Sequence, residues 1–137
     1  MNRRVALGFL LGFIIAFHGA TGLSGAKAAS GWVEYSPIVF SQAQRDGKTI
    51  LVDVHAVWCP TCKAQNPILD ELTGEPKLKD IVFIKVDFDR EKDFLRTHNI
   101  RSQSTIVVFK GTGEVARSVG QTDREKLRAF VFGSAAN

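Results

Sequence analysis

Residues 49–62, TILVDVHAVWCPTC, carry an apolar run directly into a pair of cysteines. The alternation within this run predicts a β-strand with Leu51, Asp53 and His55 on one face. Both faces are mostly apolar, which is typical of a central strand that helices cover on either side. A helical pattern follows over residues 59–72, so a strand should end, and a helix begin, at the cysteines.

Cys59 and Cys62 are the only two cysteines of the 137-residue chain. Free N–H groups and the positive end of the dipole at a helix start stabilise an anion, so the pKa of Cys59 should fall below its ordinary value. Pro60 suits the first helical position, where its missing N–H would have no partner. The spacing puts both sulfurs on one helical turn, within reach of a disulfide. We expect Cys59, at the exposed strand-to-helix corner, to attack substrates and Cys62 to resolve the mixed disulfide.

A purely structural disulfide is the alternative for this pair. Such a bond removes little entropy from the unfolded chain when it closes a loop as short as this one. Two cysteines at a helix start would therefore add little stability as a structural disulfide, but they are well placed for redox chemistry. Redox chemistry is the favoured interpretation of this pair.

Residues 52–63, VDVHAVWCPTCK, followed by PILDEL at residues 67–72, resemble the active-site strand, turn and helix of the thioredoxin family. The likeness extends more weakly to Gly120 and the last helix, and it covers nearly everything after the first thirty residues. It implies the thioredoxin fold over residues 30–137, an α/β architecture with a central mixed β-sheet flanked by helices on both faces. It also implies a thiol–disulfide oxidoreductase.

The rest of the pattern agrees with such a fold. Ser36 and Pro37 indicate a helix start and Gly47 indicates its end. Thr122 and Glu125 form a capping box for the last helix. The other expected elements are, in chain order, a strand at 31–35, a helical turn at 76–79, a strand at 81–88, a helix at 90–98, and a hairpin of strands 105–109 and 114–119.

Asp53 is the informative residue of the cysteine-bearing strand. An acid on an apolar central strand is desolvated, which should raise its pKa. The resemblance places a buried acid here, close to Cys62, where it can take and return the proton of the resolving thiol. Lys85 occupies the strand position of a lysine that pairs with this acid in thioredoxins. A structural Asp53 and a solvent-facing Lys85 are the alternatives.

Ser104 is the clearest departure from the family, which carries a cis-proline at this point, before the strand that faces the cysteines. A cis bond before a residue other than proline costs about 2.5–4 kcal/mol, so we expect a trans bond. Ser104 adds a hydroxyl and an N–H beside the sulfurs. The resemblance makes Ser104, Gln103 and Trp58 candidates for contact with substrate, and Trp58 is equally well explained as packing for the turn.

We expect no resident cofactor or metal ion. The alternative function is a soft-metal protein that holds Cu(I) or Zn(II) on the two thiolates, with His55 as the one nearby candidate ligand. A packed His55 without catalytic duty is the favoured interpretation of that residue. A third possibility is an adaptor with no redox activity.

Residues 1–29 have the pattern of a secretory signal peptide. Arg3 and Arg4 precede an apolar stretch at residues 5–17, and Ala26-Lys27-Ala28 offers a cleavage site of the small-x-small kind. An uncleaved membrane anchor is the alternative. Export predicts a periplasmic location, an oxidising compartment in which disulfide chemistry is the expected use of cysteine.

The formal net charge of +4 belongs mostly to this leader, because three of the 18 Lys and Arg residues lie in it and the remaining 15 compare with 14 acidic residues. The charge therefore gives no reason to expect nucleic-acid binding. The expected partners are protein thiols and disulfides. The chain has no second cysteine pair, so a membrane electron-donor protein would have to supply electrons if, as we expect, it reduces disulfides. The Pro60-Thr61 dipeptide does not by itself give the direction of the reaction.

Overall fold

The computed structural model describes residues 31–135. Their backbone forms one five-stranded sheet in the order β1-β3-β2-β4-β5. The elements run, in chain order, β1 (Trp32–Glu34), α1 (Pro37–Arg45), β2 (Thr49–His55), α2 (Pro60–Thr73), a short 3₁₀ helix (Pro76–Leu78), β3 (Val82–Asp87), α3 (Lys92–Thr97), β4 (Thr105–Lys110), β5 (Gly113–Val119) and α4 (Arg124–Ala135). The predicted order of strands and helices is confirmed. The predicted signal peptide, residues 1–29, lies outside the described residues.

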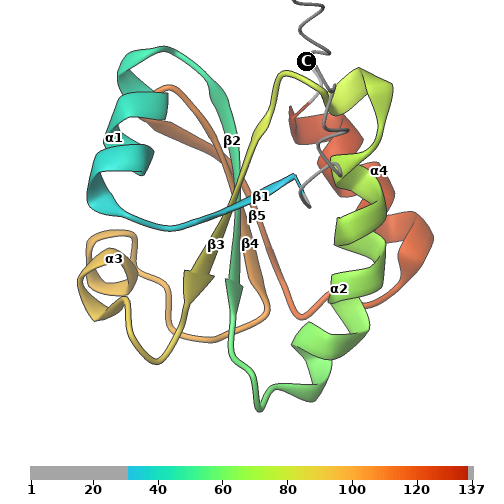
Figure 1. Ribbon diagram of the computed structural model, residues 1–137. Helices are drawn as coiled ribbons and strands as arrows, with labels where there is room; N and C mark the ends of the chain where they lie inside the picture. Colours follow the sequence, from blue (N-terminus) through green and yellow to red (C-terminus); the bar gives the residue numbers. More distant parts are fainter. Residues whose placement is uncertain (1–30, 136–137) are drawn as a thin grey trace, which may run out of the picture.

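The sheet is mixed, with β2 at its centre. β2 pairs with β3 in parallel and with β4 antiparallel, so Asp53 lies opposite Lys85 on one side and Ile106 on the other. Figure 1 shows α1 and α3 on one face of the sheet and α2 and α4 on the other. This is the predicted α/β architecture, a central mixed β-sheet flanked by helices on both faces. Among the helices of residues 31–135, none has the length and apolar composition of a membrane span.

Side chains point alternately to the two faces of the sheet along β2, and this divides the core into two layers. Ile50, Val52 and Val54 pack in a cluster with residues of α1 and α3, whereas Leu51 packs with residues of α2 and α4. Leu69 and Leu72 of α2 are among the side chains that cover that second face. The predicted face for Leu51 and Asp53 is therefore the α2 and α4 face, and β2 is buried from both sides as a central strand should be.

Local sequence sets both ends of α1. The Ser36 side chain accepts a hydrogen bond from the Val39 N–H at the start of α1, and Gly47 adopts a φ of +65° after its end. That backbone conformation costs glycine little, since it has no Cβ.

The predicted capping box of α4 is wrong. The Asp123 side chain, rather than Thr122, accepts a hydrogen bond from a first-turn amide, that of Lys126, at 2.9 Å. Both residues have side chains suited to a cap, but the helix begins at Arg124, which makes Asp123 the capping residue. Leu127 and Val131, one turn apart on α4, pack in the core.

Candidate active site

Cys59 and Cys62 lie at the junction of β2 and α2. Cys59 is the N-cap residue of α2, and its Sγ accepts a hydrogen bond from the Cys62 N–H at 3.0 Å. Pro60 occupies the first helical position, as predicted. Both cysteines are described as free thiols, so the predicted disulfide between them stays a prediction.

The predicted exposure of Cys59 is wrong. Its relative exposed area is 0% and that of Cys62 is 2%, and both pack with Ala56 and against Phe88. The strand-to-helix turn is at the surface, but the Cys59 side chain points back toward the helix and the facing loop because it caps α2.

The two thiols have opposite electrostatic environments. Burial by itself raises the pKa of Cys59, but hydrogen bonds from Cys62, the Ser104 side chain and the Thr61 backbone outweigh it and hold the pKa below the ordinary value. Burial and the neighbouring Cys59 raise the pKa of Cys62 to about 11. Cys59 is therefore the sulfur that ionises first, as its place at the helix start predicts.

Ser104 faces this pair from the loop before β4. The Cys59 thiol donates to the Ser104 Oγ at 3.9 Å, and the same hydroxyl can donate once Cys59 is a thiolate. The Ser104 backbone N–H also hydrogen-bonds to Cys62, which lowers the pKa of that thiol. A proline has neither of these donors.

The peptide bonds of residues 31–135 are all trans, so the expected trans bond before Ser104 is confirmed. Its backbone has, however, a φ of +56°, a left-handed conformation that the sequence did not indicate. A residue other than glycine held there stores on the order of 1–3 kcal/mol of strain, and it persists where surrounding contacts enforce it.

Gln65 is the functional candidate that sequence reasoning missed. It is completely buried on α2, and its Nε2 donates to the backbone oxygens of Ser104 and Gln121 at 3.4 and 2.9 Å. The spacing of residues along α2 contained a signal that could have identified it. Gln65 shares a helical stripe with Cys62, Leu69 and Leu72, and a polar side chain in a buried stripe has to find partners in the fold.

Asp53 is buried, with 0% of its area exposed, and neither carboxyl oxygen has a hydrogen-bond partner among the described residues. Burial raises its pKa to about 6, against the opposing effect of the Lys85 and His55 charges. The raised pKa agrees with the sequence-based expectation. Its role as a proton carrier for Cys62 stays a prediction.

Lys85 lies opposite Asp53 in the sheet but does not form an ion pair with it. Its Nζ sits 5.0 Å from the centre of the Trp32 ring, while the Trp32 indole N–H donates to Asp70 at 2.8 Å. The direct pairing that the resemblance implied is therefore replaced by a cation–π contact, because Trp32 of β1 offers its ring beside the ammonium group. The Lys85 charge still acts on Asp53 through space.

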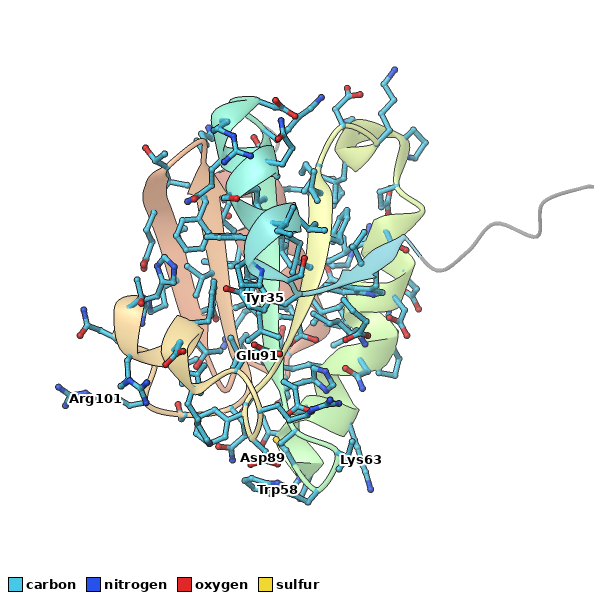
Figure 2. The ribbon with its side chains drawn as sticks, turned by 60° about the vertical axis from the view of Figure 1, so that its left-hand side comes forward. Tyr35, Trp58, Lys63, Asp89, Glu91 and Arg101 are labelled. Carbon is cyan, nitrogen blue, oxygen red and sulfur yellow. The ribbon has the colours of Figure 1, made fainter. Side chains whose placement is uncertain are left out.

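Trp58 is half-exposed at 54% and donates its indole N–H to Asp89 at 2.7 Å. Figure 2 shows these two side chains next to each other. They lie at the end of the molecule where α2 begins, near the labelled Lys63. Gln103 is half-buried beside Ser104 in the facing loop. Contact of these residues with substrate stays a prediction.

Within the part of the chain that the structure describes, no third metal ligand is grouped with the two sulfurs. Within residues 31–135, no three His, Cys, Asp or Glu side chains are grouped so as to hold a metal ion. His55, at the end of β2, is therefore not placed with Cys59 and Cys62 as a ligand set.

Comparison with known proteins agrees with this geometry. The family model described as thioredoxin matches residues 33–132. Thioredoxin C-2 of Corynebacterium nephridii is 40% identical over 82 residues, which span 60% of this chain and 75% of that protein. The thioredoxin of Chlamydia trachomatis is 36% identical over 78 residues, covering 57% of this chain and 74% of its own.

Among solved structures, Trxlp from Edwardsiella tarda shares 39% sequence identity and a TM-score of 0.70, covering 72% of this chain and 96% of that one. The residues that the family model matches include the stretch that carries both cysteines. A cysteine pair at the start of α2, a buried acid on the preceding strand and this likeness together lead to one conclusion: the chain belongs to the thioredoxin family and is a thiol–disulfide oxidoreductase.

Proposed function

We propose that this protein is exported to the periplasm and reduces disulfides in proteins there, with Cys59 as nucleophile and Cys62 as resolving thiol. The observation that supports these two roles is the difference in pKa between the two thiols. Cys59 caps α2 and accepts the Cys62 N–H, which holds its pKa low, whereas the pKa of Cys62 is raised to about 11. One thiol of the pair is therefore ready to attack and the other stays protonated until it is needed.

The reaction has two exchange steps. Cys59, after losing its proton to solvent, attacks one sulfur of a substrate disulfide, forms a mixed disulfide and releases the first substrate thiolate. Cys62 then loses its proton and attacks the Cys59 sulfur. The second substrate thiolate leaves, the Cys59–Cys62 disulfide forms, and two electrons have passed to the substrate. The two released thiolates take up two protons, which balances the two lost by the cysteines.

Asp53 is the proposed acceptor of the Cys62 proton. With a pKa of about 6, its carboxyl group is ionised at neutral pH and can take a proton in the second step. Neither of its oxygens has a hydrogen-bond partner among the described residues, so neither is committed to a structural partner. In this proposal Lys85 tunes Asp53 by its charge rather than by contact.

Export is supported by the signal-like residues 1–29, and the reducing direction by the likeness to proteins named thioredoxin. Regenerating the dithiol takes two electrons and two protons. With one cysteine pair in the chain, these must come from another protein, and a membrane protein that delivers electrons across the inner membrane is the proposed donor.

Reduction of insulin disulfides with a small dithiol as electron source tests the activity. The wild-type protein should precipitate insulin, Cys59→Ser should be inactive, and Cys62→Ser should accumulate a mixed disulfide. A redox titration without a reversible two-electron couple would contradict the activity. Faster oxidation of a reduced substrate than reduction of insulin would contradict the direction. Cell fractionation, with the N-terminus read by mass spectrometry, tests export and cleavage.

A further inference from the structure

Gln65 joins the cysteine-bearing helix to two distant loops. It follows Cys62 by one helical turn and is completely buried. Its amide nitrogen donates to the carbonyl oxygens of Ser104 and Gln121, which lie 39 and 56 positions away along the chain. These bonds satisfy the two N–H donors of the amide, whereas its Oε1 has no partner among the described residues.

The two loops are also hydrogen-bonded to each other, through the carbonyl oxygen of Ser104. The Gly120 N–H donates to the Ser104 oxygen at 2.9 Å, so this oxygen receives one bond from a backbone and one from Gln65. Gly120 has a φ of +67°, which glycine adopts at little cost. Ser104, with a φ of +56°, is strained, and these two bonds are contacts that can hold it in place.

The conformation of Ser104 matters because it directs two donors at the two sulfurs. Its hydroxyl reaches Cys59, and its backbone N–H reaches Cys62. A change of φ to a negative value would rotate the amide and the side chain relative to each other, so both donors could not keep these positions. Contacts that hold the Ser104 backbone in place therefore also hold its hydroxyl beside the thiolate of Cys59.

We propose that Gln65 is a positioning residue: its side-chain amide holds Ser104 in the left-handed conformation that aims the hydroxyl at Cys59 and the backbone N–H at Cys62. The inference rests on the proposed use of Cys59 as the nucleophile. Gln65 does not touch the sulfurs itself, and it acts through Ser104 alone.

The test is the titration of Cys59 in reduced protein, followed by thiolate absorbance near 240 nm and by the pH dependence of alkylation. Gln65→Met keeps the length of the side chain and removes both donors. It should lower the thiolate fraction of Cys59 at neutral pH about two- to tenfold, the range expected for one hydrogen bond. The midpoint of the titration should move upward, and the reduction potential should become more negative, because the thiolate of the reduced form is less stabilised.

Two controls separate positioning from packing. Leu69→Met changes a buried side chain on the same stripe of α2 and should leave the midpoint where it is in the wild type. In a Ser104→Ala background, which lacks the hydroxyl, adding Gln65→Met should have no further effect on Cys59, because the two changes act through one interaction. If Gln65→Met does not fold, Gln65→Asn, which withdraws the amide by one methylene, takes its place with the same expectation.

The inference is overturned if the folded Gln65 variant titrates like the wild type. It is also overturned if the shift is equally large in the Ser104→Ala background. A wild-type protein with no titrating thiolate and no redox couple would instead contradict the proposed function, so the two failures are distinguishable.

Discussion

Replacing Asp53 with asparagine should make the stability of the protein less dependent on pH. The native carboxyl group is fully buried, without a hydrogen-bond partner among the described residues. Burial raises its pKa to about 6, from 3.8 for an unperturbed aspartate. The folded protein therefore binds this proton more tightly than the unfolded chain does.

The sign and size of the effect follow from linkage. Below a pH of about 3.8, Asp53 is protonated in both states and has no charge to bury. As the pH rises toward 6, the unfolded chain releases the proton first, so stability falls across this window and is constant above it. The difference between 3.8 and about 6 corresponds to about 3 kcal/mol. Asparagine has nearly the same shape and no charge, so it escapes this penalty.

Urea unfolding of reduced protein, followed by circular dichroism, measures the difference. Near pH 8, Asp53→Asn should be more stable than the wild type by about 3 kcal/mol, relative to the difference between the two proteins near pH 3. Titration of the groups that do not interact with Asp53 is common to both proteins and cancels in this comparison. Equal differences at the two pH values would refute the reasoning, and would mean that Asp53 is solvated or paired in solution.

Three further predictions concern the thiols, a helix cap and the core. In single-cysteine variants at neutral pH, the protein that retains Cys59 (Cys62→Ser) should react with iodoacetamide at least tenfold faster than the one that retains Cys62 (Cys59→Ser); equal rates would contradict the assignment of the nucleophile. Ser36→Ala removes the side chain that accepts the Val39 N–H and should cost about 1 kcal/mol in urea unfolding, with no change in the Cys59 titration. Leu69→Ala opens a cavity under α2 and should cost about 2–5 kcal/mol, a loss that Leu69→Met should largely avoid; a loss below about 1 kcal/mol would show that the site collapses around the smaller side chain.

Local rules predicted most of the scaffold. The two-residue period of β2 assigned Leu51 and Asp53 to one face, and the structure confirms that face. The same kind of rule failed where two neighbours were equally suited, as at Thr122 and Asp123. There the structure begins α4 at Arg124, and Asp123 is the residue whose side chain accepts the first-turn amide.

Residues distant in sequence set the environment of the sulfurs. Cys59 is buried by residues from other parts of the fold. Its thiol contacts Ser104, and Gln65 hydrogen-bonds to Ser104, although these residues are far apart in the sequence. Local sequence patterns do not reveal such contacts. The contact of Lys85 with Trp32 likewise depends on β1 packing beside β3, and it replaced a pairing that the resemblance had suggested.

By itself, the sequence determined that a strand carries two cysteines to the first turn of a helix, because strand period, helix caps and dipole are all local properties. Only the tertiary structure decided how each sulfur is solvated and which donors it meets. Those properties depend on segments that are distant in the sequence and come together when the sheet and its helices pack.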